Sequence, residues 1–205
     1  MLMRKNLFIS LLIVIAVSLT YCKKSDRDLI FEDDFQDSLT WNTLLYPFAG
    51  SGSGSSASAT FTSEGLNMSA NQVNENSSAS IRKDIDVTVD DDFKSLCLVL
   101  KNYTFYSSTH GDGTMTLNLG NVIISFSLES YQGSYDEVIF EFKKGRMKMF
   151  ADGKELDEIE YSYSKTEGSI WDFVYYDISF AIEAGGADNY HWSRLSLASI
   201  KLYVD

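Results

Sequence analysis

Apolar and polar residues alternate so regularly along "DFVYYDISFAIEAGG" (172–186) that this stretch predicts a β-strand with one buried face. Its apolar series is Val174, Tyr176, Ile178, Phe180 and Ile182. The intervening series is Tyr175, Asp177, Ser179, Ala181 and Glu183. Successive side chains of a strand point to opposite faces of a sheet, so a period of two places the first series on one face. We expect a half-buried strand over residues 173–183.

The same period recurs along most of the chain, and no segment after residue 22 shows a sustained helical period. We expect further strands at 29–35, 65–70, 79–89, 95–106, 114–119, 121–130, 138–143, 146–151 and 195–204. Turns centred on Gly145 and Gly153 are typical of hairpins, since glycine tolerates a positive φ. About ten strands joined by short turns predict an all-β protein, and we favour an antiparallel two-sheet sandwich over a barrel.

The stretch "AGSGSGSSASAT" (49–60) is the one low-complexity segment of the chain. It has two interpretations: a flexible surface loop, or an edge strand of small residues against which a ligand or another backbone lies closely. The glycine and serine composition favours the loop.

The chain is acidic, with 29 acidic and 17 basic residues and a net charge of −12. Loss of residues 1–21 would remove Arg4 and Lys5 but no acidic residue, so the charge would become −14. Such a surface argues against nucleic acid and anionic lipid as partners.

The N-terminus reads as a signal peptide. A positive start is followed by an uncharged run over 7–20, which as a helix spans about 21 Å, short of the ~30 Å hydrocarbon core of a bilayer. The alternative is an anchor helix that is never cut. "LTYC" (19–22) resembles the lipobox of bacterial lipoproteins, although Tyr21 stands where that family has a small residue.

The lipobox resemblance implies cleavage before Cys22 and attachment of acyl chains such as palmitate to that cysteine. It divides the chain into a signal peptide (1–21), an acylated tether (22–28) and a folded domain (29–205), held at the bacterial cell envelope by its lipid anchor. Lysines rather than an aspartate follow Cys22, which favours the outer over the inner membrane. With Cys22 acylated, Cys97 in "SLCLVL" has no partner within the chain and is expected to be a small buried hydrophobe.

Residues 29–205 resemble the concanavalin A-like (laminin G-like) jelly roll. The segments that carry the resemblance are "FEDDFQDSLTWN", "EGLNMS", "FEFKKGRMKMFADGKEL" and "ASIKLYVD". The resemblance implies that the first and last strands pair. The superfamily includes sugar-binding modules, adhesion modules and glycoside hydrolases, so the fold alone does not decide function.

The stretch "ELDEIE" (155–160) resembles the Glu-x-Asp-x-x-Glu motif of laminarinase-type glycoside hydrolases of this fold. By that resemblance Glu155 is the nucleophile, Glu160 the acid/base and Asp157 the carboxylate that tunes them, and retaining hydrolysis needs two carboxyls about 5.5 Å apart. Glu158, however, occupies a position that is apolar in those enzymes. We therefore favour a non-catalytic chain in which these acids continue a hairpin.

Two loops concentrate groups suited to sugar binding, because sugar rings stack on aromatic rings while their hydroxyls hydrogen-bond. The ligand-binding candidates are Asp188, Asn189, Tyr190, His191 and Trp192 in one loop and Tyr106 and His110 in the other. The alternative is that Tyr190 and Trp192 plug the end of the sandwich.

Metal binding has only weak support in the sequence. If the first and last strands pair, Asp33 and Asp205 approach each other and offer oxygen ligands for Ca²⁺. Solvated turn acids are the simpler interpretation, and no other cofactor is expected. The chain is thus expected to be a lipoprotein with a non-catalytic jelly-roll module that binds carbohydrate at the envelope. The alternatives are the glycoside hydrolase and a module that binds another envelope protein.

Overall fold

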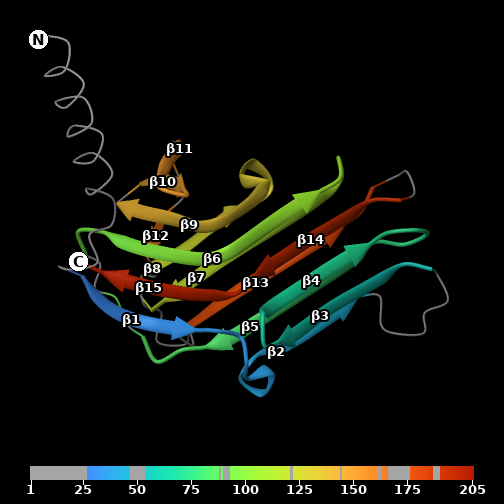
Figure 1. The fold of residues 1–205 in the computed structure, drawn as a ribbon, viewed down its shortest axis with the longest axis horizontal. Coiled ribbons are helices and arrows are strands. Elements are labelled where there is room, and N and C mark those ends of the chain that lie inside the picture. Colours follow the sequence, from blue (N-terminus) through green and yellow to red (C-terminus); the bar gives the residue numbers. More distant parts are fainter. Residues whose placement is uncertain are drawn as a thin grey trace, which may run out of the picture.

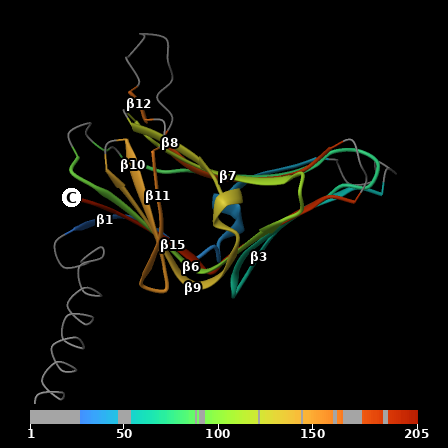
Figure 2. The same ribbon diagram turned by 90° about the horizontal axis from the view of Figure 1, so that it is seen from above.

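The computed structural model describes residues 27–46, 54–87, 89, 93–120, 122–143, 145–160, 163–165, 176–186 and 190–205, and for 157–160 and 163–165 it describes the backbone alone. In these residues the chain forms two antiparallel sheets, which Figure 1 shows face-on and Figure 2 edge-on. The predicted all-β two-sheet sandwich is confirmed.

The larger sheet runs in the order β11 (Lys154–Glu160), β10 (Arg146–Ala151), β9 (Gly133–Lys143), β6 (Leu96–Ser107), β14 (Trp192–Leu197), β4 (Gly65–Asn71) and β3 (Ser56–Thr62). Its β6 also pairs with β15 (Ser199–Val204), which pairs in turn with β1 (Asp28–Asp33). The smaller sheet runs in the order β12 (Tyr163–Lys165), β8 (Val122–Ser127), β7 (Gly111–Leu119), β13 (Tyr176–Ala184), β5 (Ser77–Asp84) and β2 (Asn42–Tyr46). Short 3₁₀ turns are η2 (Ser38–Thr40) and η3 (Glu129–Tyr131).

The first and last strands pair, as the jelly-roll resemblance implied. β1 and β15 run antiparallel side by side (Figure 1), with Asp28 opposite Val204 and Asp33 opposite Ile200. The chain passes repeatedly from one sheet to the other, so neighbours in a sheet are often distant in sequence, as β4, β14 and β6 are.

The core lies between the sheets and follows the alternation seen in the sequence. Ile178, Phe180 and Ile182 on β13 are fully buried, as the period of two predicts. Tyr103 is also buried, and its hydroxyl donates a 3.0 Å hydrogen bond to the carbonyl of Tyr131. Burial raises the pKa of Tyr103 well above its usual value, so this phenol stays protonated in the folded chain.

Several strands differ from the sequence expectation: β11 and β12 were not predicted, and the expected strand 195–204 is two strands, β14 and β15. Residues 56–62 form the edge strand β3, so the loop interpretation is wrong for them and the edge-strand alternative is right, while 49–53 lie outside the described residues. Trp192 begins a strand rather than lying in a loop, and β2 was not predicted. Small residues suit β3 because it lies at the sheet edge and pairs with β4 alone.

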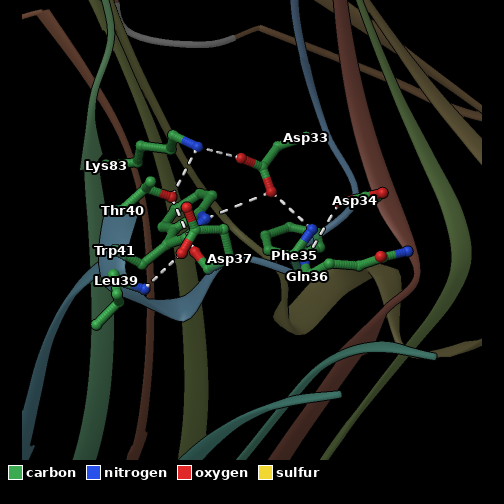
Figure 3. Close-up of polar contacts among 9 residues, drawn as sticks. All are labelled: Asp33, Asp34, Phe35, Gln36, Asp37, Leu39, Thr40, Trp41 and Lys83. Atoms are coloured by element: carbon green, nitrogen blue, oxygen red, sulfur yellow. Dashed lines mark hydrogen bonds and ion pairs between the residues drawn. The ribbon is translucent and has the colours of Figure 1, made fainter. Parts of the chain in front are cut away.

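The segment "FEDDFQDSLTWN" ties the two sheets together (Figure 3). Asp33, at the end of β1, forms an ion pair with Lys83 on β5, and its other carboxylate oxygen accepts hydrogen bonds from the backbone N–H of Phe35 (2.6 Å) and from Nε1 of Trp41 (3.4 Å). Lys83 also donates to Thr40 at 2.9 Å. Phe35 takes a φ of 59° and is fully buried against Trp41, with ring centroids 5.2 Å apart.

Cys97, on β6, is buried as predicted, but it forms a disulfide bond in the structure. The expectation of an unbonded thiol is therefore wrong. The other cysteine of the chain, Cys22, is the one that the lipobox resemblance assigns to acylation, and it lies outside the described residues.

The part of the chain that the structure describes contains no helix long and apolar enough to cross a bilayer.

Candidate ligand-binding face

The strand β14 carries the most distinctive outer surface of the larger sheet. It is a central strand with β4 on one side and β6 on the other. We call its outward surface the β14 face, made of Asn67, Ser69 and Asn71 on β4, Trp192, Arg194 and Ser196 on β14, and Thr104 and Tyr106 on β6.

The side chains of the β14 face point outward because the residues between them are core residues. Leu66, Met68 and Ala70 on β4, Leu195 and Leu197 on β14, and Phe105 on β6 are all buried. The ladder then sets which outward residues are neighbours. Trp192 lies opposite Asn71, and Arg194 lies between Ser69 on one side and Tyr106 on the other.

An aromatic group occupies one end of the β14 face. The guanidinium carbon of Arg194 lies 5.3 Å from the centre of the Trp192 ring, which is a cation–π contact. Tyr106, 44% exposed, is the direct neighbour of Arg194 across the ladder. Trp192 is partly exposed and is not part of the hydrophobic core. The plug interpretation stays a prediction, which the stability of Trp192→Ala tests.

Hydroxyl and amide groups surround the aromatic group. Ser196 donates to Oδ1 of Asn67 at 2.7 Å, and the hydroxyls of Ser69 and Ser58 lie 2.9 Å apart. The hydroxyl of Thr104 lies 2.9 Å from that of Ser134 on β9. These bonds use only part of the capacity of the groups, since a hydroxyl both donates and accepts and an amide has two donors.

A pocket of about 440 Å³ adjoins the far end of the β14 face. Its lining comes from the β3–β4 turn, from β4, from the end of β14 and from β6: Ser63, Glu64, Leu66, Asn67, Asn102, Ser196, Leu197 and Ala198. Asn102 has a φ of 49° and lies between the β6–β9 pairs Lys101↔Glu137 and Tyr103↔Tyr135, where the register continues unchanged. Gly65 has a φ of 120°, and a Cβ there would lie 2.0 Å from the carbonyl oxygen of Leu197. The pocket is thus built on two special backbone positions.

The two histidines of the chain lie together beyond the aromatic end of the face. The rings of His110 and His191 are perpendicular, with centroids 4.7 Å apart. Nδ1 of His191 lies 3.4 Å from the hydroxyl of Ser108. Within the described residues, Nε2 of His191 and Oε1 of Gln72 are buried without a hydrogen-bond partner. Such atoms are costly to bury unpaired, and a bound polar group would satisfy them.

The structure therefore brings most of the predicted ligand-binding residues to one end of the larger sheet. Tyr106 and Trp192 belong to the β14 face, His110 and His191 contact each other beside it, and Tyr190 is 76% exposed with a φ of 77°. Asp188 and Asn189 lie outside the described residues.

The residues of the laminarinase-type motif lie elsewhere, on β11 at an edge of the sheet. Glu155 is exposed and pairs with Lys148, with 3.1 Å between Oε1 and Nζ. The β10–β11 register shifts between Glu155 and Asp157, so the ladder is irregular within the motif. The side chains of Asp157 and Glu160 are not among those described.

The predicted approach of Asp33 to Asp205 is wrong. The two strands do pair, but Asp33 is opposite Ile200 while Asp205 follows Val204 at the other end of the ladder. The carboxylate oxygens of Asp33 already form an ion pair with Lys83 and accept hydrogen bonds from two N–H groups. Among the described residues, no group of three or more His, Cys, Asp or Glu side chains is arranged to hold a metal ion.

No protein-family model matches the chain, and no curated protein matches it. Several solved structures resemble it. An endo-β-galactosidase from Clostridium perfringens that releases GlcNAcα1-4Gal matches with a TM-score of 0.47 and 9% identity, over 87% of this chain and 63% of that enzyme, which is less than two thirds of its length. The carbohydrate recognition domain of Emp47p matches at 0.45 and 10%, over 88% of this chain and 97% of that one. TmCBM61, solved with β-1,4-galactotriose, matches at 0.41 and 10%, over 83% and 92%. Likenesses this remote do not identify a ligand.

Sequence reasoning missed Arg194 and the asparagines Asn67 and Asn102. The stretch "HWSRLSL" does alternate, and extending the expected strand from residue 195 back to 192 would have placed Trp192 and Arg194 on one outward face. The pairing of β14 with β4 and β6 has no local signal, because it joins segments far apart in sequence.

Proposed function

We propose that this chain is a non-catalytic carbohydrate-binding module and that the β14 face is its binding surface. The observation that carries the proposal is the Trp192–Arg194–Tyr106 group, set among hydroxyl and amide side chains on three adjacent strands. A sugar needs this combination, because its C–H face is apolar and its rim is made of hydroxyls. Patches of aromatic residues with polar neighbours are also typical of binding surfaces in general.

The magnitudes favour recognition by stacking. Stacking of a flat ring on an aromatic side chain is worth ~1–3 kcal/mol, by analogy with nucleic-acid bases. A net hydrogen bond adds about 0.5–1.5 kcal/mol. One stacked sugar with two or three hydrogen bonds therefore gives affinities in the millimolar to micromolar range once the cost of association is included.

The test compares aromatic variants in binding and in stability. Trp192→Ala and Tyr106→Ala should each weaken binding on a glycan array or in calorimetry by roughly 10- to 100-fold, since 1.4 kcal/mol is tenfold. Their melting temperatures should fall by only a few degrees, because both side chains lie outside the core. Tyr46→Ala is the matched control: Tyr46 is 46% exposed but lies on the other sheet, and its loss should leave binding unchanged.

Two results would count against the proposal. If the melting temperature of Trp192→Ala is 15 °C or more below that of the wild type, Trp192 is a structural residue. Loss of a core Trp costs about 3–5 kcal/mol of folding free energy. If the wild type binds no glycan at all, the β14 face serves another partner, and an envelope protein becomes the better candidate.

We also propose that the module is anchored by acyl chains on Cys22, at the outer membrane of a bacterial envelope. The lipobox resemblance of residues 19–22 supports this. Acylation would consume the only other thiol that can pair with Cys97 within the chain, so the anchored form and the disulfide-bonded form are alternatives. Labelling with a radioactive fatty acid should mark the wild type and not Cys22→Ser. Equal label in the wild type and in Cys22→Ser would contradict the proposal that Cys22 is the acylated residue.

A further inference from the structure

Arg194 differs from most of the described basic residues in having no acidic partner. Carboxylate oxygens lie within 4.0 Å of Arg27, Arg82, Lys83, Lys94, Lys101, Lys143, Lys148 and Lys201. In the part of the chain that the structure describes, the Arg194 side chain forms no ion pair or hydrogen bond and contacts the Trp192 ring. In a chain with 29 acidic and 17 basic residues, an arginine that pairs with none of the described carboxylates is unexpected on composition.

The position of Arg194 also suits it to bind a ligand. It lies in the middle of the β14 face, is itself exposed, and has Ser69 and Tyr106 as its neighbours across the two ladders. The cation–π contact with Trp192 uses the charge of the guanidinium and not its N–H donors, which remain available for hydrogen bonds. Arg194 therefore presents a fork of donors, held at a defined place, next to the aromatic group that would bind a sugar.

A neutral sugar is a poor match for this arrangement. A neutral sugar that binds beside Trp192 and Arg194 offers the guanidinium only hydroxyl oxygens, so the charge of Arg194 stays unmatched. A sugar that carries a carboxylate can accept bidentate hydrogen bonds from the edge of the guanidinium while Arg194 stays near the ring. Charge-assisted hydrogen bonds are roughly twice as strong as those between neutral groups. The arrangement thus favours an acidic ligand over its neutral counterpart.

The charge of the whole chain sets a limit on that ligand. At −12, the chain repels a densely charged polyanion at distances up to the Debye length, about 8 Å at physiological salt. One arginine can match one carboxylate at a time. The suitable ligand therefore carries isolated carboxylates and neutral hydroxyls, as uronic acid residues do, rather than clustered sulfates.

We infer that the β14 face selects a saccharide containing uronic acid, with the carboxylate bound by Arg194 and the sugar ring against Trp192. This inference rests on the proposed carbohydrate-binding function and adds its ligand class. Arg194 is then the residue that determines specificity, and Trp192 provides affinity for any sugar.

The experiment uses α-1,4-linked trigalacturonate, its trimethyl ester and the neutral α-1,4-linked galactotriose, which differ only at C6, the carbon that bears the carboxyl. Calorimetry on the full folded domain should show at least tenfold tighter binding of the wild type to the free acid than to either neutral probe. Arg194→Gln should remove that preference, and Arg194→Lys should keep part of it, since lysine retains the charge but not the fork. Lys154→Gln is the matched control, because Lys154 is also exposed, lies on β11 and should leave the preference unchanged.

The outcomes separate this inference from the proposed function. Equal wild-type affinity for acid and neutral probes, lost in Trp192→Ala, would overturn the inference and leave carbohydrate binding intact. Tighter binding to heparin than to trigalacturonate would overturn it in favour of a polyanion site. Absence of binding to all probes would overturn both. An acid preference that survives in Arg194→Gln would place the carboxylate elsewhere and also overturn the role of Arg194.

Discussion

Asp33 and Lys83 join the two sheets of the sandwich through an ion pair, although they lie 50 residues apart in the sequence. Asp33 ends β1 of the larger sheet and Lys83 lies on β5 of the smaller one. The side chains are only 10% and 20% exposed, so the pair is largely shielded from water. The same carboxylate holds the turn through Phe35 and Trp41. The "FEDDFQDSLTWN" segment is therefore a structural tie rather than a metal site.

Asp33→Ala should lower the free energy of unfolding by about 2–4 kcal/mol, because it leaves a shielded ammonium and two N–H groups without their acceptor. Asp34→Ala is the control. Asp34 is exposed and accepts one 3.2 Å hydrogen bond from the backbone of Gln36, so its loss should change the free energy by less than about 0.5 kcal/mol. Urea unfolding measures both. Equal losses would mean that the ion pair contributes nothing beyond a surface turn.

Gly65→Ala should be far more damaging than Gly145→Ala, although both glycines have a positive φ. At Gly145 a Cβ meets nothing within 4 Å, so the cost is the backbone strain of about 1–2 kcal/mol. At Gly65 a Cβ would lie 2.0 Å from the carbonyl oxygen of Leu197, and the β3–β4 turn must move away from β14. We expect a loss of about 3–4 kcal/mol there, the strain plus an overpacking cost. Melting temperatures of the two variants that agree within 2 °C would show that the turn adjusts freely.

Asp177→Asn should gain stability relative to the wild type as the pH rises. Burial raises the pKa of Asp177, and the nearby Asp84 raises it further, whereas Arg82 and Asn118 lower it. Because the pKa is higher in the folded than in the unfolded chain, the folded state binds the proton more readily, and its stability falls as the pH rises through that window. Asparagine resembles the protonated form, so its advantage should be larger at pH 7 than near pH 4.

Urea unfolding of the wild type and of Asp177→Asn at pH 4 and at pH 7 gives the difference in free energy of unfolding between the two proteins at each pH. We expect that difference to be larger at pH 7. Asp84→Asn controls for the loss of a contact with Arg82, because Asp84 is exposed and lies 3.3 Å from the same guanidinium. A difference between Asp177→Asn and wild type that is identical at pH 4 and pH 7 would show that burial does not control this carboxyl.

The double variant Glu155→Gln with Glu160→Gln should leave stability and glycan binding nearly unchanged. Glu155 is exposed, and its ion pair with Lys148 is worth about 0.2–1 kcal/mol at most. Release of reducing sugar from β-glucan by the wild type should not exceed that of the double variant. Hydrolysis by the wild type that is lost in the variant would establish the glycoside hydrolase and overturn the non-catalytic interpretation.

Local patterns in the sequence predicted the strands, because alternation is a property of neighbouring residues. The buried series Ile178, Phe180 and Ile182 follows directly from it. The pairing of the first and last strands came from the resemblance to a known fold and not from any local pattern. The strand β3 was missed because its small residues lack the apolar alternation on which the prediction depends, and its stability comes from pairing with β4.

The candidate site was only half predictable for the same reason. Trp192, His191, Tyr106 and His110 were singled out by residue type, and the structure brings them to one end of the sheet. Arg194 and Asn67 gain their significance only from the register, which places them beside Tyr106 and Ser196. Asp33 shows the reverse error, in which residue type suggested a site that the structure does not form. Its carboxylate suits a metal, but the β1–β15 register keeps it away from Asp205, and it pairs with Lys83 instead.

The strict alternation along β14 separates positions where substitutions alter folding from positions where they alter only the outer surface. Leu195 and Leu197 anchor the strand in the core, while Trp192, Arg194 and Ser196 take no part in that packing. Substitutions at the outward positions can therefore accumulate without loss of foldedness, since surface changes of this kind usually alter stability by less than about 0.5 kcal/mol. A lineage carrying this domain can exchange one ligand for another by changing a few side chains on a rigid scaffold. We expect relatives of this chain to keep apolar residues at 195 and 197 and to diverge at 192, 194 and 196.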